Sequence, residues 1–367
     1  MGDAAEDFIS NLPQSILENI LTRLPIGDAV GTCILSSKWR YKWATLTQLV
    51  FDENCVPISN DRVPVEKSLV KFITHALFLH QGPIHKFQLS TVHLQSCPDI
   101  DQWLLFLSRN DIRELVLELG EGEWFRVPSC LFNCRKLTRL ELFRCEFDPP
   151  LTFTGFPCLR SLNLHQVLVA PEAIESLISS CPLLESLSLS YFDSLDLNIC
   201  APKLKYLYLE GEFKDIHLES TPLLVSMSIA MYMTDDIAEH FEQSSSCNFL
   251  KILGGVPHLE KLVGYIYFTK GSSNTLAAIE APDLDFWEKE CHADCSFKQL
   301  KLVKMTDISG VPHEMELIKF LLSNSPVLEI MSITPCTFVT ERKVNMLIEL
   351  VRFIRASPRA EIIFIQN

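Results

Sequence analysis

The run Cys291-His292-Ala293-Asp294-Cys295 is the densest group of metal-binding side chains in this chain of 367 residues. Thiolate, imidazole and carboxylate groups all bind zinc, so the run offers several donors close together. A structural zinc site takes four ligands, normally as two pairs that are separated in the sequence. No second Cys/His pair stands at a recognised distance, so we expect an ordinary loop here and no metal site.

The 13 cysteines are odd in number and are scattered through apolar sequence at no regular spacing. Cys130 and Cys134, for example, lie four residues apart beside Leu131 and Phe132. This distribution suits small buried side chains better than a disulfide framework. The first seven residues also lack the basic head and apolar centre of a secretory signal, so we expect a reducing compartment.

Motifs of known catalytic sites are absent from the sequence. It contains no G-x-S-x-G, no G-x-x-x-x-G-K and no H-E-x-x-H, and its ten histidines are dispersed. His165 follows a leucine-patterned segment and is expected to face solvent or a ligand. We therefore expect no catalytic residue and no cofactor, although an acid/base pair contributed by distant segments stays open as the mark of an enzyme.

The balance of charges argues against nucleic acid and membranes as partners. Lys and Arg number 32 against 46 Asp and Glu, which gives a net charge of −14. Such a chain repels phosphates, and no apolar run approaches the roughly 18 residues of a bilayer span. The cluster Lys38-Trp39-Arg40-Tyr41-Lys42-Trp43 mixes bases with aromatic rings, but both Trp residues share one helical face. We expect this helix to dock on protein.

Three short helices are expected between residues 12 and 43. Pro13 suits a first helical turn, and Pro25 ends the first helix. Asp28 is a plausible N-cap of the second helix, and Ser36 of the third. The first helix carries one apolar stripe, made of Ile16, Leu17, Ile20, Leu21 and Leu24. Helices this short cannot bury all of this surface among themselves, so part of it should face a partner.

From Leu46 onward the chain repeats short strands of the form L-x-x-L-x-L. The clear copies, which begin 20 to 25 positions apart, are Ile112/Leu115/Leu117, Leu137/Leu140/Leu142, Leu159/Leu162/Leu164, Leu184/Leu187/Leu189, Leu204/Leu207/Leu209 and Leu224/Met227/Ile229. Weaker copies are Leu46/Leu49/Phe51, Ile84/Phe87/Leu89, Leu300/Val303/Met305 and Leu328/Met331/Ile333. This period is typical of leucine-rich repeats, which stack parallel strands into a solenoid.

Two features of the repeats are irregular. A returning helix is expected after Pro171, whereas other repeats of about 20 residues have room only for a turn. From Leu259 to Leu300 the pattern is lost, and Gly264 stands where a third apolar strand residue belongs. The pattern assigns no repeat to this interval.

The end of the chain predicts a cap on the solenoid. Two helical patterns, 315–322 and 344–354, precede an alternating strand at 360–365. Apolar residues at adjacent positions of that strand predict that both of its faces are covered. An independent recognition module on a tether stays open as the other interpretation.

The N-terminal segment resembles an F-box. The positions that carry the resemblance are Leu12-Pro13-x-x-Ile16-Leu17-x-x-Ile20-Leu21-x-x-Leu24-Pro25 and Ala29-x-x-Thr32-x-x-Leu35-Ser36-x-x-Trp39-Arg40-x-x-Trp43. Together with the repeats and the C-terminal pattern, nearly the whole chain is similar to the plant F-box/FBD/LRR-repeat family. The resemblance implies an α/β fold with an F-box at 8–45, an irregular leucine-rich-repeat solenoid at 46–296 and an FBD-type α/β cap at 297–367.

In function, the resemblance implies the substrate receptor of an SCF-type ubiquitin ligase, in the nucleus or cytoplasm. The F-box would dock on a Skp-type adaptor, and through it on cullin, while the repeats capture an unidentified protein target. The receptor itself performs no chemistry, because the ligase acts by holding the target near a charged enzyme. A scaffold or sequestering protein without ubiquitin transfer stays open.

The residues expected to contact these partners form two sets. The adaptor-binding set is Leu12, Pro13, Ile16, Leu17, Ile20, Leu21, Leu24, Pro25, Leu35, Trp39 and Trp43, some of which can instead hold the three helices together. The target-binding set, on the exposed positions between the strand leucines, is Glu141, Phe143, Asn163, His165, Tyr206, Tyr208 and Glu210. Glu114, Val116 and Glu118 are expected on the same exposed face. Binding of the target by loops instead stays open.

Overall fold

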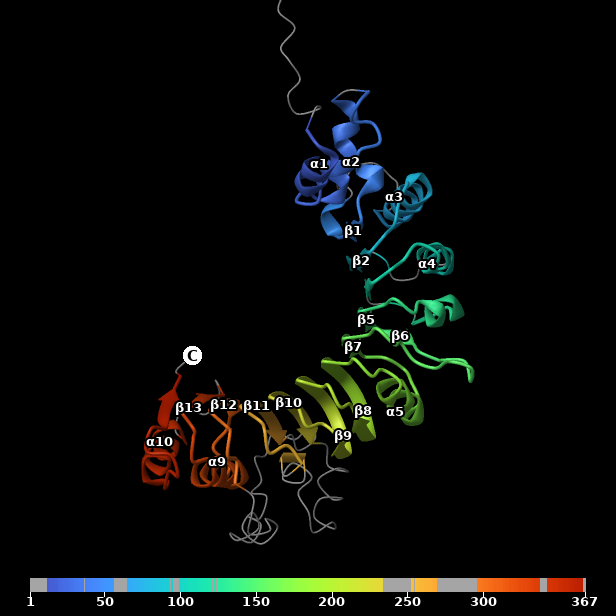
Figure 1. Cartoon of the computed structure of the whole chain (residues 1–367). Coiled ribbons are helices and arrows are strands. Elements are labelled where there is room, and N and C mark those ends of the chain that lie inside the picture. Colours follow the sequence, from blue (N-terminus) through green and yellow to red (C-terminus); the bar gives the residue numbers. More distant parts are fainter. Residues whose placement is uncertain are drawn as a thin grey trace, which may run out of the picture. The chain divides into compact units, whose positions relative to one another are not determined.

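The structure is a computed structural model that describes residues 12–35, 37–55, 65–92, 94, 99–120, 122, 124–233, 252–253, 255–268, 296–336 and 342–365. The chain divides into two compact units, Met1–Ala173 and Ile174–Asn367 (Figure 1). Parallel strands are the main element of both. The predicted metal-like run at 291–295 lies outside the described residues.

The N-terminal module contains helices α1, Gln14–Leu21, and α2, Ile26–Gly31, followed by the single 3-10 turns η1, Thr32–Ile34, and η2, Trp43–Thr45. Pro13 and Pro25 occupy the N-cap positions of the two helices in extended conformations. The expected N-cap at Asp28 is wrong, because α2 begins three residues earlier, with Pro25 as its N-cap. The third helix is also wrong, since residues 37–42 form turns before η2.

The first unit continues as a parallel sheet in chain order: β1, Gln48–Phe51; β2, Lys86–Thr91; β3, Glu114–Leu119; β5, Arg139–Phe143; and β7, Ser161–His165. The segments that connect the strands contain η3, Glu53–Cys55; α3, Val65–Leu79; α4, Ile100–Ser108; and η4, Ser129–Asn133. A small ribbon pairs β4, Phe125–Arg126, with β6, Cys145–Glu146. Figure 1 shows α3 and α4 on the same side of the strands.

In the second unit the strands again follow chain order: β8, Ser186–Cys200; β9, Tyr206–Glu219; β10, Ser226–Met233; β11, Lys261–Phe268; β12, Leu302–Ile308; β13, Ile330–Pro335; and β14, Glu361–Phe364. Helix α5, Pro171–Ser179, precedes β8, as the sequence predicts. Helices α9, Pro312–Asn324, and α10, Arg342–Arg352, connect the last three strands.

The leucine pattern predicts the core of the sheets correctly. Leu115, Leu140 and Leu162 are register partners on neighbouring strands, and all are buried. Every residue of the ten predicted copies is buried in the same way. Because a fully buried leucine stabilises a fold by about 1.5–3 kcal/mol, these aligned rows are a large part of the favourable energy. Val116 was expected on the exposed face but is buried.

A repeat does occupy part of the interval that the sequence left unassigned. Strand β11 pairs in parallel with β10 and β12, and its Leu262 and the preceding Leu259 are buried like the leucines of the other copies. Gly264 takes the third position, opposite Met305 of β12. A Cβ atom on Gly264 would lie 2.9 Å from Met305 Sδ, so the methionine side chain fills the space that a third leucine takes elsewhere.

The final strand is not covered on both faces, contrary to the sequence prediction. Strand β14 pairs only with β13 among the described strands, so it forms an edge. Its side chains alternate between exposed and half-buried, and Ile363 keeps 38% of its surface exposed. Adjacent apolar residues here therefore mark a partly exposed edge. The capping role of the C-terminal segment remains a prediction.

Replacing Gly264 by valine should lower the free energy of unfolding by about 1–3 kcal/mol, because overfilling a packed interior forces its neighbours to shift. Adding Met305→Ala to the same chain should restore part of the loss, since it removes the atoms that the new side chain meets. Denaturant unfolding followed by circular dichroism measures both. Gly31→Ala is the control, because a Cβ there meets nothing within 4 Å. A Gly264→Val chain as stable as the parent would contradict this account of β11.

Glu314 accepts the hydrogen bonds that hold the start of α9. Its buried carboxylate accepts hydrogen bonds from Ser309 Oγ at 3.0 Å and from the backbone amides of Gly310 and Val311 at 2.7 and 3.3 Å. Replacement by alanine leaves these donors without their acceptor and should cost about 1–2 kcal/mol. Glutamine retains an acceptor and should cost less.

The Glu314 carboxyl group also makes the stability of the fold depend on pH. Burial raises the pKa of Glu314 above 4.5, although the hydrogen bonds oppose the shift. The folded state therefore holds the proton more tightly than the unfolded chain does, and this contribution to stability falls as the pH rises through the raised pKa. Relative to Glu314→Gln, the parent chain should lose stability from pH 4.5 upward in denaturant titrations. A difference that grows in favour of the parent would refute this.

Candidate functional site

An exposed apolar surface lies on the N-terminal module. We name it the helix patch and define it by Ile16, Ile20, Leu24, Ile34 and Leu35, which are 45, 40, 39, 85 and 67% exposed. Ile16 and Ile20 are four residues apart on α1 and so share one face of the helix. Large apolar side chains exposed on so small a module are costly in water unless a partner covers them, which makes these residues candidates for a protein interface.

The predicted adaptor-binding residues divide by burial. Leu17, Leu21, Trp39 and Trp43 are buried in the module and hold its short helices together. Pro13 and Pro25 are exposed and Leu12 is half-buried, so these remain accessible beside Ile16, Ile20, Leu24 and Leu35. Ile34, which is 85% exposed, was not among the predicted residues. Contact of any of these residues with an adaptor remains a prediction.

Polar contacts fix α1 against the end of the module. Gln14 Nε2 donates a hydrogen bond to Thr45 Oγ1 at 3.0 Å, and Lys42 Nζ donates to Gln14 Oε1 at 3.1 Å. Gly27 of α2 approaches the backbone so closely that a Cβ would lie 2.7 Å from the carbonyl oxygen of Cys55. These contacts hold the helix patch on a defined backbone next to β1.

Four predicted target-binding residues lie together in the first unit. Glu141 and Phe143 of β5 are register partners of Asn163 and His165 of β7, and all four are half-buried. The rings of Phe143 and His165 have centroids 5.2 Å apart. Arg139 Nη2 lies 2.6 Å from Glu141 Oε1, so an ion pair offsets part of the negative charge expected here.

The other three predicted residues lie in the second unit, on β9. Tyr206 is 54% exposed, and the Tyr208 hydroxyl donates a hydrogen bond of 2.8 Å to Glu210 Oε2. Tyr191 of β8 joins them, because the negative charge of Glu210 is the main cause that raises the pKa of its phenol. Tyr191 was not predicted, since it is an extra residue between Ser190 and Phe192 where the pairing with β9 shifts.

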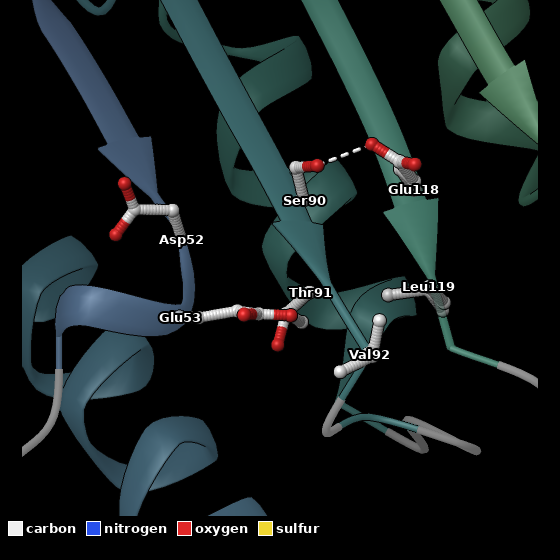
Figure 2. Close-up of a pocket in the computed structure, with 7 residues that line it drawn as sticks. All are labelled: Asp52, Glu53, Ser90, Thr91, Val92, Glu118 and Leu119. Atoms are coloured by element: carbon white, nitrogen blue, oxygen red, sulfur yellow. Dashed lines mark hydrogen bonds between the residues drawn. The ribbon is translucent and has the colours of Figure 1, made fainter.

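A pocket of 320 Å³ lies at the carboxyl ends of β1, β2 and β3 (Figure 2). Its walls are Asp52, Glu53, Ser90, Thr91, Val92, Glu118 and Leu119. Ser90 Oγ donates a hydrogen bond to Glu118, while Figure 2 shows the Asp52 carboxylate pointing away from this pair. The carboxylates give the pocket a negative potential, which disfavours anionic ligands.

Three buried cysteines are placed for packing. Burial raises the pKa of the Cys55, Cys134 and Cys145 thiols to about 12, so they stay protonated and poorly nucleophilic. Within the described ranges, no three His, Cys, Asp or Glu side chains are grouped to hold a metal ion. Among the described helices, none is both long and apolar enough to cross a membrane.

A helical module with exposed apolar side chains, followed by parallel strands of leucine-rich sequence, defines an α/β repeat protein. Three family models match the chain in the order expected. The F-box domain matches residues 9–48, the LRR repeats of FBD-associated F-box protein At5g56370 match residues 100–263, and FBD matches residues 289–333. The exact domain boundaries remain a prediction.

Relatives of the same organisation exist in Arabidopsis thaliana. F-box/FBD/LRR-repeat protein At1g13570 is 56% identical over 100% of both chains. F-box/FBD/LRR-repeat protein At3g26920 is 27% identical over 98% of this chain and 96% of its own. The chain belongs to the F-box/FBD/LRR-repeat family, as the sequence motifs predicted.

The division of the module into core and surface can be tested by stability. Leu17→Ala should lower the free energy of unfolding by about 2–5 kcal/mol, because it leaves a cavity in the module. Ile16→Ala, on the same helix, should change it by less than about 1 kcal/mol, since that side chain is partly exposed already. Denaturant titration of the full chain, read by tryptophan fluorescence from the buried Trp39 and Trp43, measures both. Equal losses in the two variants would contradict the assignment.

Proposed function

We propose that this F-box protein is the substrate-recognition subunit of an SCF-type ubiquitin ligase. In this proposal the F-box docks on a Skp-type adaptor that connects it to cullin, and the repeats bind the protein to be ubiquitinated. The observation that supports it best is the helix patch, whose apolar residues stay exposed while other apolar residues of the same module are buried.

The module buries some of its apolar residues and leaves others exposed. Leu17, Leu21 and the two tryptophans are buried in its interior, whereas Ile20 and Leu35 are exposed and so contribute less to folding. Apolar side chains that become buried in an interface can each contribute about 2–4 kcal/mol to binding. A patch of this kind therefore supports adaptor docking better than it supports any role inside the chain.

The repeats supply the other half of the proposal. In-register strands present their intervening side chains on one face, which offers a broad surface to a protein target. The receptor needs no catalytic group, because the ligase accelerates transfer by raising the effective concentration of the target near a charged enzyme. The nine described cysteines are free thiols, which supports a place in the nucleus or cytoplasm.

Substituting the exposed patch should abolish adaptor binding without unfolding the chain. Ile20→Asp together with Leu35→Asp places two charges where an apolar interface would form, and should weaken binding to a purified Skp-type adaptor at least about 30-fold. Size-exclusion chromatography of the mixed proteins, followed by calorimetric titration, measures the loss.

The control is Leu151→Asp, which adds one such charge at a fully exposed leucine outside the module. It should bind the adaptor like the parent chain. Unchanged adaptor affinity in the double variant, with its fold intact by circular dichroism, would refute adaptor docking through the helix patch.

A further inference from the structure

A cluster of three tyrosines and one carboxylate lies on strands β8 and β9 of the second unit. We name it the tyrosine–glutamate cluster and define it by Tyr191, Tyr206, Tyr208 and Glu210. Tyr206 and Tyr191 are 54 and 49% exposed, while Tyr208 and Glu210 are half-buried. Exposed aromatic rings on rigid strands are the kind of side chain that dominates the energy of protein interfaces.

The neighbours of the tyrosines on the sheet are small. Tyr206 is opposite Ser186 of β8 and Ser226 of β10, and Tyr208 is opposite Ser188 and Ser228. Serine side chains reach only a short way out of the sheet, so they cannot cover the two aromatic rings. Space beside the rings is therefore available to a side chain of a partner.

Hydrogen bonds fix the carboxylate among the rings. The Tyr208 hydroxyl donates to Glu210 Oε2 at 2.8 Å, and the pKa of the Tyr191 phenol is raised first by the charge of Glu210, with a hydrogen bond to it as a smaller cause. Among residues Ser186–Tyr191, Tyr206–Glu210 and Ser226–Ala230, Glu210 is the one charged residue. A negative charge fixed between aromatic rings complements a flat cation.

We propose that the tyrosine–glutamate cluster binds an arginine side chain in an extended basic segment of the target protein. The planar guanidinium can pair with the Glu210 carboxylate and stack on a tyrosine ring, whereas a lysine ammonium has no flat face to stack. The inference rests on the proposed function, because it identifies the chemistry of the target that the repeats would hold.

The site is tested on the full-length chain with a fluorescent (Gly-Ser-Arg)4 peptide as probe and (Gly-Ser-Gln)4 as the neutral comparison. Fluorescence anisotropy at physiological salt should show binding of the arginine peptide alone. Glu210→Gln removes the charge but keeps the shape, and should weaken binding at least 10-fold. Tyr208→Phe, which removes only the hydroxyl that orients Glu210, should weaken it by a smaller factor.

The matched control is Glu219→Gln, which makes the same change of charge at an exposed position near the end of β9. It should retain the parent affinity within about twofold. Equal weakening by Glu210→Gln and Glu219→Gln would show only general attraction to an acidic chain, and equal binding of the neutral peptide would exclude recognition of arginine. Either result overturns the proposal.

Adaptor binding is measured on the same preparations. A failure of the proposed function can then be told apart from a failure of the proposed arginine site. Loss of arginine binding in Glu210→Gln with normal adaptor binding supports the cluster as a target site. A parent chain that binds the adaptor but not the arginine peptide overturns the cluster and leaves the proposed function standing. A chain that binds the arginine peptide through Glu210 but no adaptor overturns the proposed function alone.

Discussion

The parallel, in-register pairing of the strands is the constraint on which the rest of the structure depends. Once Leu207, Met227 and Leu262 align on β9, β10 and β11, every second side chain must point into the interior. The residues between them then share one surface, because successive side chains of a strand alternate between faces. A slip of one residue would expose the leucines and bury the tyrosines, so the apolar rows also determine which residues can meet a target.

Several repeats share a second feature, a residue in the left-handed conformation just after the leucine-patterned part of the strand. Arg144, Gln166, Tyr191, Gly211 and Asp307 each stand two positions after the last apolar residue of their copy and have φ between 51° and 138°. The recurrence makes this geometry a property of the repeat, so the φ of 59° at Tyr191 is no sign of function in itself. The left-handed conformation of Tyr191 has a local consequence, because this extra residue brings an aromatic side chain next to Glu210.

The family, the order of the domains and the buried rows could be predicted from the sequence, because leucines at fixed spacing leave few alternatives. The short helices were harder. Trp39 and Trp43 are four residues apart, a spacing that suits a helix, yet turns bury them equally well. Pattern alone could not separate Ile16 from Leu17, since both are apolar and only packing decides which is covered. The roles of Gly264 and Tyr191 depend on contacts with residues of neighbouring strands, namely Met305 and Glu210 respectively. No single segment of the sequence reveals such contacts.

The central claim is that the chain holds a target on its repeats while its F-box delivers that target for ubiquitination. The most direct measurement is affinity purification from native tissue under proteasome inhibition, comparing the parent chain with the variant that carries aspartate at positions 20 and 35. Quantitative mass spectrometry reads both the captured proteins and their ubiquitin conjugates. The account predicts that the variant captures the same proteins, without adaptor, cullin or ubiquitin conjugates. Equal ubiquitin conjugation in both purifications, or captured proteins without conjugates in either, would contradict it and would favour a scaffold or sequestering role.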